Sequence, residues 1–364
     1  MSSAAVTRRP STGLERPSAD SEASARLPAR SADVLRSVVD AYLVSGEPVG
    51  SATVAENAAG EMSAATARVV LSGLADRGLV SQPHSSAGRV PTEGGLRVYV
   101  DQLVRPRAPS PRAREEVDQA LRSAGSESGP VVRAAARHLA SACGLTALGQ
   151  PPRMDAARVH ALRLVSLPPN SVLAMLVFVD GSVRHRTFVR TGDDADWQRV
   201  QNLFDRELAG HTLAAIRARL EGDVMRDSGL DAKTRALAVQ TLPSGEISED
   251  AVIIEGRNHI LEHGPQLETL GDVLRTLDDK RRLLEFLDGL GGGEGTRVLL
   301  GKDSAQHGLP SCSVVAAPYS VDGQPGGTLA LVGPLRVEYA RVMSLVSYTA
   351  DAISGILRTA RGSA

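Results

Sequence analysis

The sequence predicts an α+β, multidomain protein that begins with a winged helix-turn-helix. Two short helical segments, a turn between them and a hairpin with a basic tip occupy residues 47–89. Further along the chain, strand-like segments lie on both sides of a long, charged, helix-rich block. Strands that precede and follow a helical block predict one α+β domain with a helical insertion.

The first expected domain covers residues 31–104. Ser31 is placed to cap a helix with one apolar stripe, and Ser63 to cap the third helix, which Arg77-Gly78 would end. Strands are expected at 79–82 and 89–90, on either side of a turn. This order is typical of the winged helix, in which one helix enters the major groove of DNA.

Composition narrows the classes of function. The chain has 364 residues and a formal net charge of −1, so affinity for nucleic acid must come from local positive charge. Six arginines stand against three acidic residues between Arg68 and Arg107. The two cysteines lie far apart and predict reduced thiols. No apolar run reaches the ~18 residues of a membrane span, so the expected localisation is cytoplasmic, in association with the nucleoid.

The other domain boundaries follow changes in composition and periodicity. Residues 1–30 are rich in Ser, Ala, Pro and Arg and predict a disordered tail. A Pro/Arg hinge and linker helices are expected in 105–150. The α+β domain is expected in two parts, 151–222 and 294–364, of which the second ends in a C-terminal helix, and the helical insertion is expected at 223–293.

The candidate DNA-binding residues lie on the third helix and on the hairpin. Arg68 stands near the start of the helix, where recognition helices contact base edges, and arginine to guanine is the commonest specific contact. Basic hairpins grip phosphates or enter the minor groove. A solvated arginine and a histidine packed inside the turn are the alternatives for Arg68 and His84. The candidates for double-stranded DNA are Ser63, Ala65, Thr66, Arg68, Val69, His84, Ser85, Ser86 and Arg89.

Patterns that would indicate an enzyme are missing from the sequence. No G-x-S-x-G elbow occurs, and Gly301-Lys302-Asp303 lacks the Ser or Thr of a phosphate-binding loop. The eight histidines and two cysteines do not have the spacing of zinc ligands. We therefore expect no catalytic residues, no cofactor and no metal.

Five segments carry a resemblance to a known family. They are G-E-P-V-G-S (46–51), Q-P-H-S-S-A-G-R-V-P-T (82–92), Y-V-D-Q-L (99–103), A-P-Y-S (317–320) and G-P-L-R-V-E-Y-A-R-V (333–342). Through them, the chain resembles the bacterial heat-inducible transcription repressors, HrcA, from about residue 30 to residue 357. The resemblance implies a winged helix, a GAF-like domain and a dimerisation domain inserted into it. It also implies a homodimer on an inverted-repeat operator upstream of chaperone genes, with activity modulated by the GroEL chaperonin.

The third helix departs from the pattern of that family. The family's A-T-I-R-N-E-M is A-T-A-R-V-V-L here, so Thr66 and Arg68 are kept while Val69 and Val70 replace Asn and Glu. Valine side chains form no hydrogen bonds, so we expect altered base reading, mainly at Val69 because Val70 falls on the apolar stripe. Two alternatives stay open. One is a ligand-sensing winged-helix regulator of a different operator, and the other is a paralogue without DNA binding that acts as an interaction module.

The dimer contact is expected in the helical block, because its helices carry apolar stripes that need a partner. The positions on these stripes are Leu270, Val273, Leu274, Leu277, Leu283, Leu284 and Leu287.

Overall fold

The computed structural model describes residues 27–57, 62–85, 87–153, 157–179, 181–222, 231–243, 251–263, 269–293, 295–321 and 323–362. The chain divides into two compact units, Met1–Val104 and Arg105–Ala364. This division coincides with the end of the expected winged-helix domain. The expected disordered tail lies outside the described residues up to residue 26.

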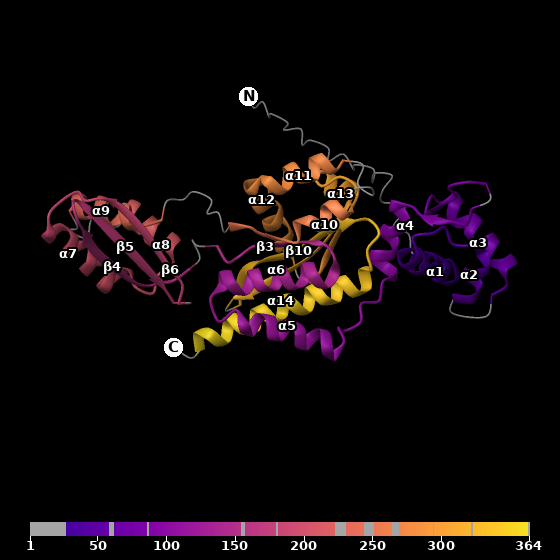
Figure 1. Ribbon diagram of the computed structural model, residues 1–364, viewed down its shortest axis with the longest axis horizontal. Helices are drawn as coiled ribbons and strands as arrows, with labels where there is room; N and C mark the ends of the chain where they lie inside the picture. The colour runs from indigo at the N-terminus through magenta and orange to yellow at the C-terminus, as the bar shows by residue number, and fades with distance from the viewer. Residues whose placement is uncertain are drawn as a thin grey trace, which may run out of the picture. The chain divides into compact units, whose positions relative to one another are not determined.

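The N-terminal unit contains helices and one small hairpin (Figure 1). Its elements are α1 (Ala29–Ser45), α2 (Ser51–Asn57), α3 (Ala64–Asp76), β1 (Val80–Ser81), β2 (Val90–Pro91), α4 (Glu93–Val98) and a π-helical turn (Tyr99–Leu103). The predicted Ser31 cap is wrong, because α1 begins directly after Pro28 and without a side-chain cap. The proline ring imposes a φ of −53° there, close to the helical value.

The core of this unit lies between α1 and the elements that follow it. Leu35 and Val38 of α1 are fully buried, as are Leu71 and Leu74 of α3 to within a few per cent. The hydroxyl group of Tyr99 donates a hydrogen bond of 2.5 Å to Oδ1 of Asp40. The last turn of the unit is therefore fastened to α1 by a polar contact as well as by apolar packing.

A five-stranded sheet forms the centre of the C-terminal unit, with the strand order β7-β3-β10-β9-β8. Its strands are β3 (Thr146–Gly149), β7 (Ile253–Glu255), β8 (Arg297–Leu300), β9 (Cys312–Val321) and β10 (Gln324–Pro334). Figure 1 shows α6 and α14 on one side of this sheet and α11 and α12 on the other. The helices around it are α5 (Pro111–Ser123), α6 (Ser128–Cys143), α10 (Arg257–Glu262), α11 (Leu270–Asp278), α12 (Lys280–Gly291), α13 (Lys302–Ala305) and α14 (Tyr339–Gly362).

A second module is inserted between β3 and β7. These two strands are antiparallel neighbours, with Ala147 opposite Glu255, so the chain leaves the five-stranded sheet after β3 and rejoins it at β7. The inserted module has the elements β4 (Val159–Leu167), β5 (Ser171–Phe178), β6 (Val183–Val189), α7 (Asp194–Leu203), a π-helical turn (Phe204–Leu208), α8 (Leu213–Glu221) and α9 (Ala232–Thr241). Its strands form a separate sheet of order β4-β5-β6.

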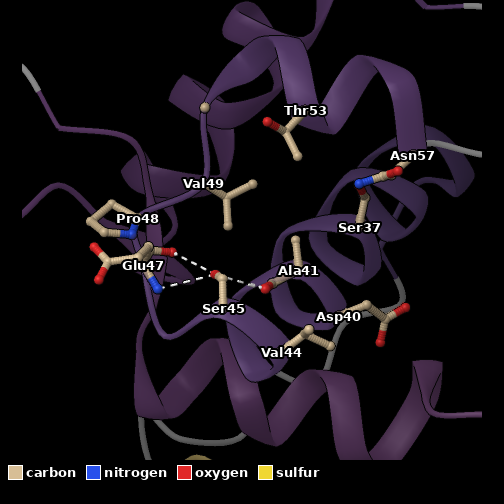
Figure 2. Close-up of a pocket in the computed structure, with 11 residues that line it drawn as sticks. Ser37, Asp40, Ala41, Val44, Ser45, Glu47, Pro48, Val49, Thr53 and Asn57 are labelled. Carbon is tan, nitrogen blue, oxygen red and sulfur yellow. Dashed lines mark hydrogen bonds between the residues drawn. The ribbon is translucent and has the colours of Figure 1, made fainter.

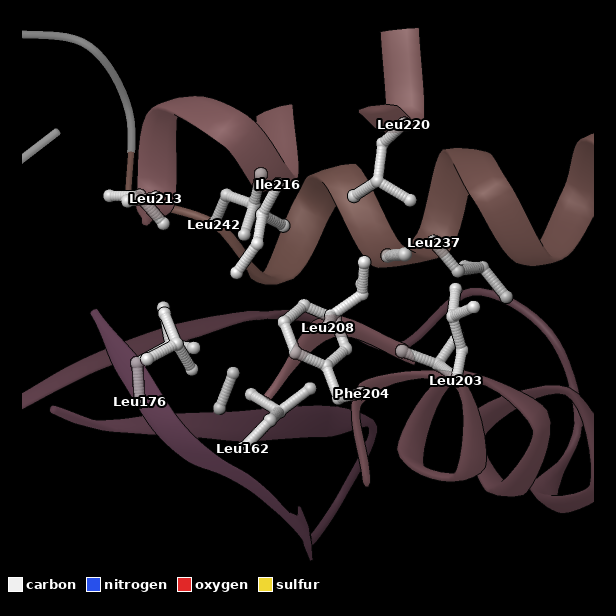
Figure 3. Close-up of a cluster of buried hydrophobic side chains, with 14 of the residues drawn as sticks. Leu162, Leu176, Leu203, Phe204, Leu208, Leu213, Ile216, Leu220, Leu237 and Leu242 are labelled. Atoms are coloured by element: carbon white, nitrogen blue, oxygen red, sulfur yellow. The ribbon is translucent and has the colours of Figure 1, made fainter. Parts of the chain in front are cut away.

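The inserted module has a core of its own (Figure 3). Leu162 and Leu176 of the sheet meet Phe204, Ile216 and Leu237 from the helical segments, and all five are at least 96% buried. The two groups of side chains face each other in Figure 3. One face of the three-stranded sheet is therefore covered by helices.

These groupings differ from the boundaries that the sequence predicts. The expected insertion begins at residue 223 and would have separated α9 from β4–β6. In the structure, β4–β6 and α7–α9 share one core. Helices α11 and α12, which were expected in the insertion, pack instead on the five-stranded sheet. Periodicity misplaced the boundary because β3 and β7 are only four and three residues long, and β3 is buried at every position, so neither shows strand alternation.

The predicted dimer stripe is also used differently. Val273, Leu277, Leu283 and Leu287 are buried to 99% or more within the chain, against the sheet strands that include β9 and β10. Leu270, Leu274 and Leu284 are partly buried against the same core. The stripe is amphipathic because it covers a sheet, so it is not available to a second chain.

The other face of the three-stranded sheet is not covered by the helices of the module, and it carries apolar side chains beside polar ones. Leu173, Met175 and Val177 of β5 alternate with the buried Val172, Ala174 and Leu176, and therefore point away from the helices. Cross-strand pairing adds apolar residues of β4 and β6 to this side, and it also places Arg163, His185 and Thr187 there, all three exposed. Among the large hydrophobic residues that are exposed in the described chain, four lie here: Val165 (41% exposed), Leu167 (36%), Val183 (47%) and Val189 (67%). We call these seven residues the outer face.

Asp196 links two helices of the inserted module. It belongs to the capping box of α7, where its Oδ2 accepts a hydrogen bond of 2.9 Å from the amide of Asp193. The same oxygen lies 2.5 Å from Nζ of Lys233 on α9, and the other oxygen pairs with Arg199. The Asp196 side chain is only 2% exposed. These donors, Lys233 first, lower the pKa of the Asp196 carboxyl below its ordinary value.

We predict that Asp196→Asn lowers the stability of the inserted module at neutral pH, because Lys233 and Arg199 lose their anionic partner. A lowered folded-state pKa means that the stabilisation is complete above the unfolded pKa of about 3.9 and is lost as the pH falls through the folded value. The difference between variant and wild type should therefore stay constant from pH 8 to pH 5 and narrow in stronger acid. Urea unfolding followed by fluorescence measures this locally, because Trp197 on α7 is the sole tryptophan.

Asp194→Asn on the same helix is the control, since the Asp194 side chain is 89% exposed in its pair with Arg190. An equal loss of stability in both variants would contradict a special role for Asp196.

Candidate nucleic-acid interface

The beginning of α3 is set by side-chain capping. Oγ of Ser63 accepts a hydrogen bond of 3.1 Å from the amide of Thr66 and lies 2.9 Å from Oγ1 of Thr66. The predicted Ser63 cap is therefore confirmed. Both hydroxyl groups take part in the cap, which fixes the residue at which α3 starts and hence which residues point outward.

One face of α3 is buried and the opposite face is exposed. Ala67, Leu71 and Leu74 point into the core. Val69 is 73% exposed, and Val70 is half-buried, as the apolar stripe predicts. The exposed residues of α3 are Ala65, Arg68, Val69, Ser72, Gly73 and Asp76. Their spacing of three and four residues places them on one side of the helix, which we call the outward face of α3.

Sequence reasoning missed two polar residues of this face. Ser72 and Asp76 follow Arg68 at helical spacings of four and eight residues and are exposed. Extending the helical period beyond the first turn would have found them. Asp76 is the one acidic group of the outward face, so it lowers the local positive charge near the end of α3.

The hairpin between β1 and β2 is the wing, and it is joined to the loop before α2. The amide of Val49 donates to the carbonyl of Arg89 (2.8 Å), and the amide of Arg89 donates to the carbonyl of Val49 (2.9 Å). A Cβ on Gly88 would lie 2.5 Å from the carbonyl carbon and oxygen of Val49. Only glycine fits at this distance. Segments 46–51 and 82–92, two of the five that carry the family resemblance, are therefore in direct contact.

The base of the wing is joined to the end of α3. Oγ1 of Thr92 donates a hydrogen bond of 2.6 Å to the carbonyl of Gly78 and accepts one of 3.1 Å from the amide of Gly95, which caps α4. A Cβ on Gly95 would lie 2.0 Å from the carbonyl oxygen of Leu79. The wing thus leaves α3 and enters α4 through close backbone contacts.

The tip of the wing carries polar, exposed residues. His84 and Ser85 are exposed, so His84 is not the packed turn residue of the alternative interpretation. Arg89 is half-buried at the junction with Val49. Ser86 lies outside the described residues. The side-chain amide of Gln82, which sequence reasoning missed, donates to the carbonyls of Ser85 and Ala87, both at 2.9 Å.

A pocket of about 560 Å³ lies between α1, the loop after it and α2 (Figure 2). Oγ of Ser45 accepts from the amide of Glu47 (3.1 Å) and donates to the carbonyl of Ala41 (3.0 Å), so the loop is held at its start. The carboxylates in the lining belong to Asp40 and Glu47, and none of its residues is basic. This surface is therefore unsuited to phosphate, in contrast to Arg68 and the wing.

The cysteines are placed unfavourably for catalysis. Burial raises the pKa of the Cys143 thiol to about 11 and that of the Cys312 thiol to about 12, so both are protonated at neutral pH. Within the described ranges, no group of three or more His, Cys, Asp or Glu side chains is arranged to hold a metal ion. No described helix is long and apolar enough to cross a membrane.

Comparison with known proteins gives a consistent family. Residues 130–343 match the family described as HrcA protein C terminal domain. The heat-inducible transcription repressor HrcA of Sorangium cellulosum is 33% identical over 344 residues, 90% of this chain and 97% of that protein. The same repressor of Sphingopyxis alaskensis is 33% identical over 349 residues, 91% and 98% of the two chains.

The fold has a counterpart among solved structures. The crystal structure of a hypothetical protein at 2.2 Å resolution aligns with a TM-score of 0.63 at 22% identity. It covers 92% of this chain and 100% of the other. The two chains therefore share an overall fold.

We predict that Gly88→Ala destabilises the N-terminal unit by about 1–3 kcal/mol, because the added methyl group must displace the Val49 backbone. Gly73→Ala is the matched control. It lies inside α3 with no atom within 4 Å of the added Cβ, so it should stabilise the unit by up to about 1 kcal/mol. The denaturant dependence of amide hydrogen exchange in α1 and α3 reports on this unit separately. Equal exchange in the two variants would mean that the wing tolerates a side chain at Gly88.

Proposed function

Because this chain belongs to the HrcA family of heat-inducible transcription repressors, we propose that it represses chaperone genes as a homodimer bound to an inverted-repeat operator. The winged helix of the N-terminal unit makes the DNA contacts. The protein acts in the cytoplasm at the nucleoid, and the GroEL chaperonin modulates its activity. The part given to the chaperonin rests on the family resemblance alone.

The observation that carries the proposal is the outward face of α3. A capped helix that exposes Ala65, Arg68 and Val69 in its first turns has the form with which helix-turn-helix proteins read the major groove. Arg68 supplies the guanidinium group for a guanine edge. Thr66 and Ser63 position the helix start, where a phosphate can also be bound by backbone amides.

The wing supplies a second kind of contact. His84, Ser85, Ser86 and Arg89 are proposed to contact the DNA backbone, which positions the protein without reading sequence. The wing follows α3 directly in the chain and is joined to it through Thr92. A wing and a recognition helix that are fastened together can act on one DNA site.

The small positive charge of the winged helix supports a homodimer. The net charge is −1, and the excess of positive charge between Arg68 and Arg107 is small, so one winged helix would bind weakly. Two linked copies bind two half-sites and add their contacts. A two-fold operator therefore matches a two-fold protein.

The outer face of the three-stranded sheet is the surface that we propose for the dimer contact. Its seven apolar residues lie beside the polar Arg163, His185 and Thr187 and are wholly or partly exposed in a monomer, and exposed apolar patches rimmed by polar residues mark interaction sites. A second copy is the occupant that the family's inverted-repeat operator requires, and a self-complementary apolar face suits a two-fold contact. The outer face takes the place of the stripe of α11 and α12 as the proposed dimer contact, because that stripe is buried in the core of the chain.

The two alternatives are less well supported. A ligand-sensing regulator would need an apolar pocket with convergent polar groups in the C-terminal unit. The face of its five-stranded sheet toward α11 and α12 is filled by side chains such as Phe286 and Leu290. The argument for a paralogue without DNA binding depends on Val69 and Val70. Val70 is half-buried, so a polar residue at that position would reach few bases. Selection of binding sites from random DNA separates all three, since the paralogue would recover no motif.

We predict that Arg68→Ala and Arg89→Ala weaken DNA binding in different ways. Arg68→Ala should lose about 1–3 kcal/mol of discrimination between operator and scrambled duplex, because a base contact is removed. Arg89→Ala should weaken binding to both duplexes evenly and flatten the salt dependence, because a phosphate contact is removed. Fluorescence anisotropy over a salt series measures both quantities. A uniform loss in both variants would reassign Arg68 to a phosphate.

We predict that Val183→Glu combined with Val189→Glu converts the dimer to a monomer. Both valines are exposed in the chain, so the fold should persist, whereas two buried carboxylates would cost a dimer several kcal/mol, about 2 or more for each. Sedimentation velocity measures the change in mass. The matched control is Val44→Glu with Val69→Glu, which alters two valines of the N-terminal unit that are more exposed still, 78% and 73%. A dimer that persists in the first variant would exclude the outer face.

A further inference from the structure

The turn at the tip of the wing is closed by a side chain. Gln82 follows β1 directly, and its Nε2 donates one hydrogen bond to the carbonyl of Ser85 and another to the carbonyl of Ala87, each 2.9 Å long. The turn also contains a backbone hydrogen bond of 2.9 Å from the amide of Ala87 to the carbonyl of His84. One amide group thus spans the turn and uses both of its N–H donors.

We propose that Gln82 is a positioning residue for DNA binding, which orders the tip of the wing before DNA arrives. This inference rests on the proposed function, since it assigns a part within the same DNA contact. Gln82 itself needs no contact with DNA. It acts through the wing residues His84, Ser85 and Arg89.

The first argument concerns the carbonyl groups of the tip. A carbonyl oxygen carries partial negative charge and repels a phosphate group at close range. The oxygens of Ser85 and Ala87 are directed to the Gln82 amide. The bonds therefore commit two acceptors of the tip to a donor within the protein, and those oxygens need not face the DNA backbone.

The second argument concerns entropy. An exposed turn that is disordered in the free protein must be ordered on binding, and that ordering reduces affinity. The base of the wing is already held on two sides, by Val49 against Arg89 and by Gly78 against Thr92. The Gln82 amide extends this order from the base to Ser85, which is the described residue nearest the middle of the turn.

The third argument is that the two hydrogen bonds add little to the stability of the fold. Residues 82–85 are exposed to solvent, where each hydrogen bond replaces one with water. A bidentate contact at an exposed position is therefore better explained by the shape that it gives the turn than by its contribution to unfolding free energy.

The test uses the full chain with Gln82→Met, which keeps the length of the side chain and removes the donors. Gln102→Met is the matched control, because Gln102 is an exposed glutamine of the same unit in the π-helical turn. Hydrogen exchange of peptides that cover the wing is measured without DNA. Binding is measured by anisotropy with a labelled duplex that carries the inverted repeat upstream of the chaperone genes, and with a scrambled duplex of equal length.

Gln82→Met should speed exchange in the wing and leave the thermal midpoint unchanged. Affinity for both duplexes should fall about 3- to 10-fold, which corresponds to one or two weak hydrogen bonds of preorganisation. The loss of affinity caused by Gln82→Met should be smaller in a chain that also carries Arg89→Ala, because the Arg89 contact that Gln82 positions is then already absent. Gln102→Met should change none of these quantities.

Unchanged exchange in the wing would overturn the proposal, and so would a loss of affinity that is the same with and without Arg89. If the wild-type chain bound neither duplex, the proposed function would fail and the DNA role of Gln82 with it. Exchange in the free protein would still decide whether the Gln82 amide orders the wing, so the two failures are distinguishable.

Discussion

The reciprocal pairing of Val49 with Arg89 is the contact on which the N-terminal unit depends. It joins the loop before α2 to the wing at residues that are forty positions apart in sequence, and it leaves no room for a side chain at Gly88. The loop leads into the first helix of the helix-turn-helix, and the wing leaves from its second helix. One short backbone contact therefore sets the relation of the parts from which the proposed DNA surface is built.

The C-terminal unit depends on a similar local pairing, that of β3 with β7. Because these two short strands are neighbours, a whole module can be inserted between them without disturbing the five-stranded sheet. Each module then buries apolar residues in a core of its own. The five-stranded sheet is covered on both faces by helices, whereas the three-stranded sheet is covered on one. This asymmetry leaves the outer face of the inserted module uncovered, and that is why the outer face is the surface proposed for the contact with a second chain.

The two units contribute differently to the proposed repressor. The N-terminal unit offers a few cationic and polar groups on rigidly capped elements, and its acidic pocket lies elsewhere on the unit. With so small an excess of charge, the proposed DNA affinity would come from duplication as well as from the groups themselves. The valines at 69 and 70 fit this proposal, because a valine at position 69 cannot form hydrogen bonds to a base and would leave more of the affinity to the wing and the second copy.

Local patterns were sufficient for many of the individual elements. The strands 159–167, 183–189 and 297–300 follow from β-rich composition and a hairpin turn, and the Ser63 cap from capping chemistry, all of which depend on neighbours in sequence. The outward position of Arg68 and Val69 follows from the helical period in the same way. Tertiary structure alone decided the rest. An apolar stripe such as that of α11 and α12 indicates that the helices pack against an apolar surface. That surface can be a sheet of the same chain or a second chain, and the stripe does not distinguish them. Short buried strands such as β3 and β7 show no alternation, and Gln82 acquires its partners only when the turn is closed. These features arise from contacts between segments, and no window of the sequence contains both sides of them.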